Sequence, residues 1–384
     1  MRIADLDALV LGPPGRRLTI VRLATDAGRV GLGAARLAEP IAPVLAYLGE
    51  KGPRLLVGAD PFEPGKLAPA LRGGTPARAG GVGAAAAALI EVACWDLIGQ
   101  ALGVPVYRLL GGAVRDRIPA CASGWWPQER SPEALAAAAQ RVATAGYRAL
   151  TLEPFGAGDA EPSRAELHGA LDRGVAVRAA VGPDVEIVVA LGGRFTPAAA
   201  VRVARVLERI EPGWLQEPIP PGDPGALRDV ARRIRCPVSA GAGLPDRGAF
   251  RELLQRRACD LIGPDLTRVG GLGEARTLAA LAEVFSLQVA LRGAAGPVVT
   301  AANLHLAATL PNLRAVEHVI PDIPVASSPG PEVDPTRDVI SGGPVVVAGA
   351  FPLPEGPGLG VSLNEEALRA AGPQVRHVPL GTAY

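Results

Sequence analysis

This 384-residue sequence contains two lysines and four cysteines, and its formal net charge is only +1. Its two lysines, Lys51 and Lys66, lie in the N-terminal third, so we expect no lysine base or Schiff-base lysine in the rest of the chain. Basic and acidic residues number 39 and 38 and are spread without long blocks of one sign. This balance argues against nucleic acid or an anionic membrane as a partner.

The four cysteines are far apart and show no Cys-x-x-Cys spacing, which argues against a structural zinc site or a redox pair. We expect buried free thiols in a reducing compartment. The first residues carry acids where a signal peptide needs an apolar stretch, and the alanine-rich run at 84–98 is interrupted by Glu91 and Asp96. The sequence therefore predicts a soluble, cytoplasmic protein.

Short apolar runs alternate with amphipathic helical stretches from residue 118 onward. Eight of these runs are predicted strands: 118–123, 149–152, 186–189, 214–215, 238–240, 261–262, 288–291 and 315–317. Ser131 and Thr196 each precede a proline, a pattern typical of helix starts. Strands and helices in this alternation favour an α/β fold of the β/α-barrel type, with functional residues at the C-terminal ends of the strands. An open, doubly wound sheet is the alternative, but its glycine-rich fingerprint is missing.

The two ends of the chain depart from this pattern. Residues 17–37 alternate apolar and polar positions around a turn, and 84–101 read as an alanine-rich helix, which together indicate a small α+β domain. Proline and glycine are frequent after the last barrel strand. We therefore divide the chain into an N-terminal α+β domain at 1–115, a barrel at 116–321 and a C-terminal segment at 322–384 that returns to the first domain.

Five segments carry motifs that follow one another along the chain: 93–112, 146–156, 217–221, 259–271 and 357–361. In this order and spacing they resemble the enolase superfamily, and within it the mandelate racemase and muconate lactonizing enzyme family. The stretch Leu-Glu-Pro-Phe-Gly at 152–156 is most similar to galactonate dehydratases. The resemblance implies a (β/α)7β TIM-like barrel, an N-terminal α+β capping domain and a homo-oligomer, either a dimer or an octamer.

In that family, acids at the ends of the third, fourth and fifth barrel strands hold a magnesium ion, which stabilises an enolate next to the substrate carboxylate. The positions that match by resemblance are Ala190, Gln216 and Ala242. Alanine offers no oxygen ligand to a divalent cation. The resemblance therefore implies that the metal-binding residues are lost, and we predict no metal and no other cofactor.

The family's proton-transfer positions are also altered. Thr151 stands where the usual base is a lysine, while Glu153 matches an acid that galactonate-type relatives share. Asp265 matches the acid that orients a catalytic histidine, and Arg292 replaces the histidine itself. Because arginine stays protonated, it cannot exchange a proton as histidine does. We predict Asp265, Glu153 and Arg292 as the candidate catalytic residues.

Two interpretations of these charges stay open. Arg292 and Asp265 either form an ion pair that fills the metal's place or leave the guanidinium free to clamp a carboxylate or phosphate. Glu153 either titrates among apolar walls as a general acid or base, or is kept ionised by Arg292 or Arg268. Glu217, beside the matched ligand position, is predicted to point away from the pocket as a structural hydrogen-bond acceptor.

Seven residues are predicted to contact a substrate at this face of the barrel: Arg292, Thr151, Gln216, Trp125, Trp126, His318 and Glu317. The two tryptophans either wall a pocket or pack under the capping domain. His318 is the only histidine expected on this face, and no partner is placed beside it.

The residues leave two functions open. The first is a divergent family member without a magnesium site, which binds a small carboxylate or other anion and catalyses metal-independent proton transfer as an isomerase or lyase. The second is a catalytically inactive pseudoenzyme with a binding or assembly role. An ordinary magnesium-dependent racemase or sugar-acid dehydratase fits the scaffold but not the residues at the three strand ends.

Overall fold

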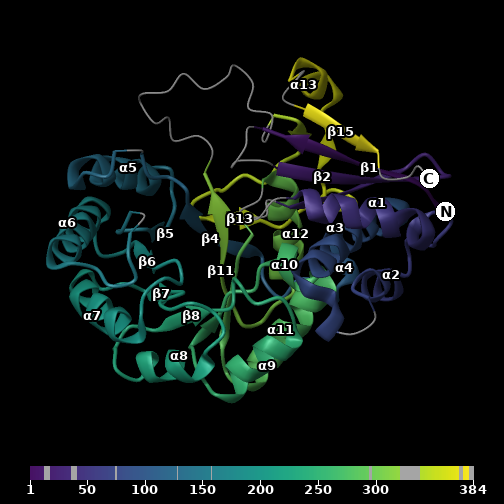
Figure 1. Cartoon of the computed structure of the whole chain (residues 1–384). Coiled ribbons are helices and arrows are strands. Elements are labelled where there is room, and N and C mark those ends of the chain that lie inside the picture. The colour runs from purple at the N-terminus through teal and green to yellow at the C-terminus, as the bar shows by residue number, and fades with distance from the viewer. Residues whose placement is uncertain are drawn as a thin grey trace.

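The computed structural model describes residues 1–12, 18–35, 41–73, 76–127, 129–156, 158–293, 296–320, 338–371 and 375–379. Within them an antiparallel sheet with its helices lies beside a barrel of parallel strands that is surrounded by helices (Figure 1). The first and last described strands of the chain pair in the same antiparallel sheet (Figure 1).

The antiparallel sheet runs in the order β15-β1-β2-β3. Its strands are β1 (Ile3–Leu11), β2 (Leu18–Thr25), β3 (Val30–Ala35) and β15 (Val375–Pro379), and its helices are α1 (Ala42–Leu56), α2 (Pro64–Leu71) and α3 (Pro76–Leu102). The close approach of α3 to β3 depends on glycine, because a Cβ at Gly33 would lie 1.9 Å from the carbonyl oxygen of Leu89. The sheet and α3 thus share one core.

Eight parallel strands form the barrel, and β11 pairs back with β4 to close it. They are β4 (Arg117–Ser123), β5 (Ala149–Leu152), β6 (Glu186–Ala190), β7 (Trp214–Gln216), β8 (Val238–Ala240), β9 (Leu261–Ile262), β10 (Gln288–Leu291) and β11 (Leu313–Val319). Each coincides with a predicted strand or extends it by a few residues. The barrel prediction is confirmed, and the closing pair excludes the open sheet.

Helices alternate with these strands around the outside of the barrel (Figure 1). The longer ones are α5 (Pro132–Thr144), α6 (Arg164–Val181), α7 (Pro197–Leu207), α8 (Pro224–Ala231), α9 (Arg247–Gln255), α11 (Leu272–Val284) and α12 (Pro297–Ala308), and the short ones are α4 (Val106–Leu109), η1 (Glu208–Ile210) and α10 (Leu266–Val269). Ser131 and Thr196 cap α5 and α7 by accepting backbone N–H groups, as their position before proline predicts.

The barrel interior is filled in layers. One layer is apolar and consists of Cys121, Ala149, Val188, Trp214, Leu261, Ala290 and Ala315. Since side chains alternate along a strand, residues two positions further on point inward again, nearer the C-terminal mouth. On β5, β6 and β7 these are Thr151, Ala190 and Gln216, so the layer below the mouth is partly polar.

The C-terminal part of the chain contacts both the barrel and the first domain. Its elements are β12 (Ile340–Ser341), β13 (Ala350–Pro352), β14 (Ser362–Leu363), α13 (Glu365–Ala370) and β15. Strand β13 pairs antiparallel with β4, and β15 pairs antiparallel with β1. The predicted boundary between barrel and C-terminal segment, at 321–322, lies outside the described residues.

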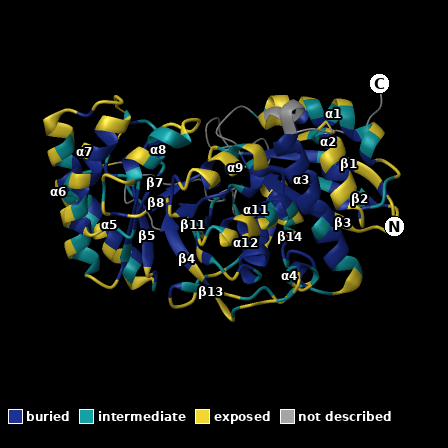
Figure 2. Ribbon diagram, turned by 90° about the horizontal axis from the view of Figure 1, so that it is seen from below, coloured by how far each residue is buried: buried dark blue, intermediate teal, exposed yellow. Residues whose placement is uncertain are grey.

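Helix α3 is the centre of the contact between the parts (Figure 2). Its Glu91 carboxylate is buried and accepts the backbone N–H groups of Leu272 and Gly273 at 2.7 and 2.9 Å, at the start of α11. Its Asp96 carboxylate accepts those of Leu32 and Leu359, in β3 and the C-terminal segment, at 3.0 and 2.8 Å. Two buried acids of one helix thus hold three parts of the chain together.

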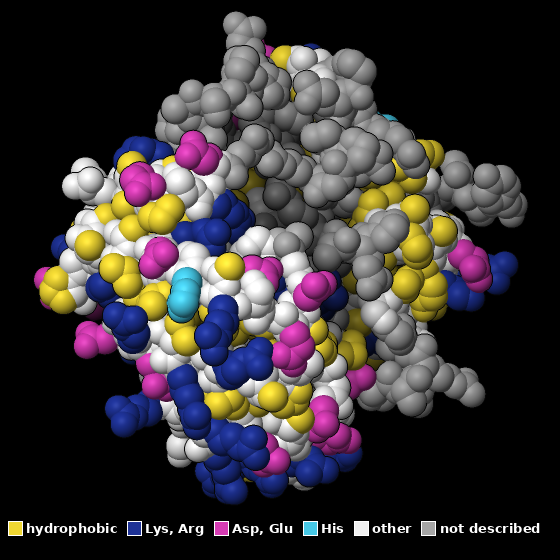
Figure 3. Space-filling model, turned by 60° about the vertical axis from the view of Figure 1, so that its left-hand side comes forward, with side chains coloured by type: hydrophobic (Ala, Val, Ile, Leu, Met, Phe, Trp, Pro, Cys, Tyr) yellow, Lys and Arg dark blue, Asp and Glu magenta, His cyan; other side chains and the backbone are white. Residues whose placement is uncertain are grey.

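Among the described residues, the stretch Gly81–Leu102 of α3 has the length and hydropathy of a membrane span, but 83% of its most apolar window is buried inside the protein. It is therefore a core helix, as Figure 2 shows. On the face of the molecule in Figure 3, basic and acidic side chains are interspersed over the outer helices. This distribution agrees with the nearly zero net charge.

Candidate active site at the barrel mouth

The three strand ends that match the family's metal positions lie side by side in the sheet. Ala190 pairs with Gln216, and Gln216 pairs with Ser239, three residues before Ala242. Gln216 is buried, and its Oε1 has no hydrogen-bond partner among the described residues. Nor do three acids, histidines or cysteines of the described residues lie close enough together to hold a metal ion. One neutral oxygen between two alanines does not fit a magnesium ion.

Glu217 is a structural acceptor, as the alternation along β7 predicts. Its Oε1 accepts the backbone N–H of Ala242 at 2.8 Å, and its carbonyl accepts that of Gly193 at 2.6 Å. The residue has a φ of 49°, a left-handed conformation that few side chains adopt. Burial raises the pKa of its carboxyl, and the nearby charge of Arg292 opposes that shift. Glu217 therefore ties the ends of β6, β7 and β8 together.

Arg292 at the end of β10 forms its ion pair with Glu317 on β11. The distance from Nε of Arg292 to Oε2 of Glu317 is 3.2 Å, and the side chains are 26% and 11% exposed. The backbone N–H of Arg292 donates to the carbonyl oxygen of Pro264, and the side-chain amide of Asn303 donates to the carbonyl oxygen of Arg292. These two hydrogen bonds fix the backbone of the arginine. Of the two interpretations given above, the ion pair between Arg292 and Asp265 is not formed: the two residues share a parallel backbone bridge, and their charges interact at a longer distance than an ion pair.

Asp265 instead begins α10. Its Oδ1 accepts the backbone N–H of Thr267 at 2.9 Å and the hydroxyl of Thr267 at 2.7 Å. Arg268 lies further off, with 3.9 Å between its Nε and Oδ2 of Asp265. Burial raises the pKa of Asp265, whereas the hydrogen bonds from Thr267 and the charges of Arg268 and Arg292 lower it. One carboxylate oxygen is thus committed to the helix start, and the other has Arg268 as its ion-pair partner.

Glu153, just after β5, is the most exposed acid of the mouth, with a side chain that is 44% exposed. Its partner is neither Arg292 nor Arg268 but Arg130, whose Nη2 lies 3.7 Å from Oε2 of Glu153. Partial burial raises the pKa of Glu153, while Arg130 and then Arg292 lower it. The result is a carboxyl that can hold a proton more readily than an exposed glutamate.

Trp125 and Thr151 form part of the wall behind the mouth. Trp125 is 1% exposed and its Nε1 donates to the carbonyl oxygen of Thr151 at 2.8 Å. The hydroxyl of Thr151 lies 3.5 Å from the sulfur of Cys121, inside the barrel. Of the two interpretations given above for the tryptophans, the burial of Trp125 favours packing, and the substrate contact stays a prediction. Trp126, edge-on to Trp125, is less buried and carries Arg130 over its ring.

His318 points away from the mouth, contrary to the prediction. Its neighbour Glu317 faces inward to Arg292, and adjacent residues of a strand point to opposite faces. The ring of His318 therefore lies outside the barrel, where Nδ1 is 2.7 Å from the hydroxyl of Tyr147 and the ring packs edge-on against Phe351. Burial lowers the pKa of His318 to about 4, so the ring is neutral near pH 7.

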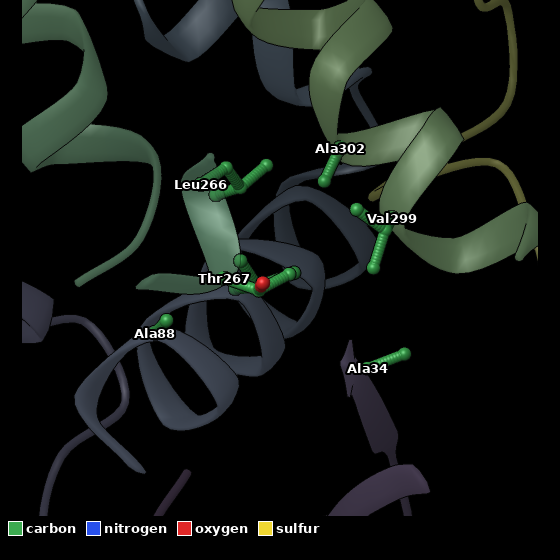
Figure 4. A pocket seen from close by; sticks show the side chains of 7 residues that line it. Ala34, Ala88, Leu266, Thr267, Val299 and Ala302 are labelled. Carbon is green, nitrogen blue, oxygen red and sulfur yellow. The ribbon is translucent and has the colours of Figure 1, made fainter. Parts of the chain in front are cut away.

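A separate small pocket lies between the N-terminal domain and the barrel (Figure 4). Its walls leave no room for a water molecule, and it is lined by Ala34, Ala88, Val92, Leu266, Thr267, Val299 and Ala302. Thr267 is its one polar residue and belongs with Asp265 through the hydrogen bonds described above. The pocket is otherwise apolar, so it is not part of the charged mouth.

Arg130 is a mouth residue that the sequence did not reveal. It directly precedes Ser131, the cap of α5, and so lies in the loop after β4 at the C-terminal end of the barrel. Position after a barrel strand is the signal that could have identified it. Its partner could not be foreseen, because the side chain reaches across to the next loop.

The fold and this arrangement of acids and arginine at the strand ends define a β/α-barrel protein with a capping domain. Residues 14–111 match the model of the mandelate racemase and muconate lactonizing enzyme N-terminal domain, and residues 133–367 match that of the enolase C-terminal domain-like family. The chain therefore belongs to the mandelate racemase and muconate lactonizing enzyme family of the enolase superfamily.

Similar proteins cover nearly the whole chain. A D-gluconate dehydratase of Thermoproteus tenax is 32% identical over 94% of this chain and 71% of its own length. A D-gluconate/D-galactonate dehydratase of Picrophilus torridus is 29% identical over 95% and 93%. The crystal structure of a mandelate racemase/muconate lactonizing enzyme from Jannaschia sp. CCS1 has a TM-score of 0.86 and 29% identity, covering 97% of both chains.

These relatives correct the function that the sequence predicts. The residues alone favour a metal-free anion binder with metal-independent proton transfer, or an inactive pseudoenzyme. The relatives are instead named as dehydratases of sugar acids, which are lyases, and they match the chain from end to end. The comparisons thus support the class that the residues alone rank last, although the residues at the three strand ends differ from the family's pattern.

Proposed function

We propose that this chain is a lyase of the sugar-acid dehydratase class, and that its substrate is a polyhydroxy carboxylate bound at the C-terminal mouth of the barrel. Its similarity over 94% of its length to a D-gluconate dehydratase supports the class. The buried Oε1 of Gln216, which lacks a partner among the described residues, supports the substrate type. A buried oxygen of this kind is costly unless it accepts a hydrogen bond, and a sugar hydroxyl provides one.

The positive charge nearest to the site comes from Arg292. Its Nε is paired with Glu317, and the outer edge of its planar guanidinium is the proposed contact for a ligand. This edge matches the geometry of a carboxylate, so Arg292 is the proposed anchor for the acid group of the substrate. Thr151, two residues before Glu153, lies in the same interior layer as Gln216 and is a proposed contact for a hydroxyl.

Dehydration of a sugar acid removes a proton from the carbon next to the carboxylate and a hydroxyl from the following carbon. The product is an enol that rearranges to a 2-keto-3-deoxy acid. Glu153 and Asp265 are the proposed proton-transfer residues, because both carboxyls have raised pKa values and both border the mouth. A raised pKa allows a carboxyl to give a proton to the departing hydroxyl.

A panel of D-gluconate, D-galactonate, D-xylonate and D-mannonate tests the proposal. Each is incubated with the protein and magnesium, and the 2-keto-3-deoxy product is measured by a carbonyl reagent. We expect turnover of at least one acid and its loss in Arg292→Ala. Absence of both turnover and binding for every acid, the latter measured by calorimetry, would reject the proposal.

We also propose that the protein acts in the cytoplasm as a homo-oligomer and keeps the domain division given above. Four buried free cysteines among the described residues are consistent with a reducing compartment. Light scattering of the purified protein measures the oligomeric state, and a monomer at micromolar concentration would contradict this proposal.

A further inference from the structure

A sugar acid held at Arg292 extends toward the loops that follow β4 and β5. We propose that Trp126 and Arg130, in the first of these loops, form a subsite for a second anionic group, a carboxylate or a phosphate, at the far end of the sugar acid. This inference rests on the proposed function. It makes Arg130 a specificity-determining residue for acids that are charged at both ends.

The guanidinium of Arg130 is held in a fixed position. Its Nη1 donates to the carbonyl oxygen of Glu153 at 2.9 Å, and its Cζ lies 5.4 Å from the centroid of the Trp126 ring. The backbone is fixed as well, because Nε of Arg173 donates to the carbonyl oxygen of Arg130 at 2.9 Å. A guanidinium that is fixed before a ligand binds loses little entropy on binding, which favours recognition of an anion.

The charge of Arg130 is only weakly paired. Among the described residues its one ion pair is the 3.7 Å contact with Glu153, whereas Arg247 and Glu274 on the barrel exterior approach to 2.6 Å. Its strong hydrogen bond goes to a neutral carbonyl group. The side chain is 27% exposed, so solvent reaches it. Arg130 can therefore bind a ligand anion without first breaking a close ion pair.

Glu153 links this subsite to the proposed anchor. Arg130 lies 3.7 Å from the carboxyl of Glu153, and the charge of Arg292 also lowers the pKa of that carboxyl, so both guanidinium groups are within electrostatic reach of it. A ligand that extends from Arg292 past Glu153 meets Arg130 at its other end. The partly exposed ring of Trp126 beneath the guanidinium offers an apolar face to the carbon chain of the ligand.

Arg268 is the other weakly paired arginine at the mouth, and it fits the role less well. Its acid partner is Asp265, which already caps α10, and it follows β9 rather than a strand next to Glu153. The described contacts of Arg268 include no aromatic ring, whereas Arg130 lies over Trp126. The observations therefore favour the loop after β4.

Three ligands with the same six-carbon chain test the subsite: D-gluconate, D-glucarate and 6-phospho-D-gluconate. They differ at the sixth carbon, which carries a hydroxyl, a carboxylate or a phosphate. By calorimetry we expect at least one ligand that is charged at both ends to bind wild type about tenfold tighter than gluconate, the size of one charge-assisted hydrogen bond. In Arg130→Met this ratio should fall to about twofold or less. The tighter of the two charged ligands identifies a carboxylate or a phosphate as the group that is recognised.

Arg130→Lys and Arg228→Ala are the matched controls. Arg130→Lys keeps the positive charge and should retain part of the preference for the charged ligands. Arg228→Ala removes an arginine of α8 that is paired with Asp229, and it should leave the affinity ratio unchanged. Equal affinity of all three ligands for wild type would overturn the subsite and leave the proposed function standing. An equal loss for all three ligands in Arg130→Met would also overturn it, since the arginine would then only position Glu153. Failure of every ligand to bind would reject the subsite and the proposed function together.

Discussion

The guanidinium of Arg292 and the carboxylate of Glu317 lie 3.2 Å apart across the ends of β10 and β11. The arginine is surrounded by further acids, since Glu217, Asp265 and Glu153 all raise its pKa together with Glu317. One fixed positive charge thus serves several partly buried carboxyls. Its removal should affect both the stability of the barrel mouth and the binding of an anion.

We expect Arg292→Met to lower the free energy of unfolding by roughly 2 kcal/mol, below the range for a fully buried pair because both side chains keep some exposure. Glu317→Gln should lower the free energy of unfolding by less, because Arg292 still interacts with Glu217 and Asp265. Urea unfolding of the two single variants and the double variant measures their coupling. The double variant should be more stable than the sum of the single effects predicts, by about 1 kcal/mol.

If the two single effects add up to the effect of the double variant, the contact between Arg292 and Glu317 does not stabilise the protein. Arg228→Met with its neighbour Asp229→Asn on α8 provides the comparison, because that exposed pair should show almost no coupling.

The fold could be predicted because the strands and helices of the barrel follow local rules. Short apolar runs such as 149–152 and 238–240 coincide with β5 and β8, and proline after Ser131 marks the start of α5. Such signals depend on the period of hydrophobic residues and on capping chemistry, both of which are visible in a single sequence.

The contacts of the site could be predicted only in part. The alternation of side chains along β7 predicts that Glu217 is a structural acceptor. On β11 the same alternation means that His318 points outward, because its neighbour Glu317 points inward. The choice of Glu317 over Asp265 as the partner of Arg292 depends on side-chain reach across neighbouring strands. No sequence period encodes that reach, and the contact between the loop residue Arg130 and Glu153 could not be predicted for the same reason.

Glu91 should be one of the most sensitive positions far from the mouth. Its carboxylate accepts two backbone N–H groups of α11 and the Nε1 of Trp95 at 2.7 Å. We expect Glu91→Ala to cost about 3 kcal/mol, because it leaves one buried and two partly buried donors without this acceptor. Thermal and urea unfolding measure the loss, and Glu50→Ala, an exposed acid on α1, should change little. An equal effect of the two substitutions would show that the link between α3 and α11 adds no stability.

Asp96 gives a prediction for the dependence of stability on pH. Burial raises its pKa to about 6, well above the ordinary value of an aspartate, so the folded protein binds a proton that the unfolded chain has released. This contribution to stability is therefore fully present below pH ~4 and is lost as pH rises to ~6, by at most about 3 kcal/mol. Other buried acids such as Glu91 and Glu217 also have raised pKa values, so the measurement is the difference between wild type and Asp96→Asn. That difference should change with pH between ~4 and ~6 and be constant above. A difference that is constant throughout would contradict the shifted pKa.

Gly358 shows how tightly the C-terminal segment fits against Asp96. Gly358 has a φ of 68°, and a Cβ there would lie 2.3 Å from Oδ1 of Asp96 and 2.8 Å from its carbonyl oxygen. Gly58 has a similar φ of 79°, but no atom lies within 4 Å of the position that a Cβ would take there. Alanine at either position costs about 1 kcal/mol for the left-handed backbone. The additional cost at Gly358 comes from displacing the segment that Asp96 holds, so we expect Gly358→Ala to lose at least about 2 kcal/mol more than Gly58→Ala in urea unfolding. Equal losses would mean that the segment moves aside freely and that its contact with α3 contributes little to the stability of the folded chain.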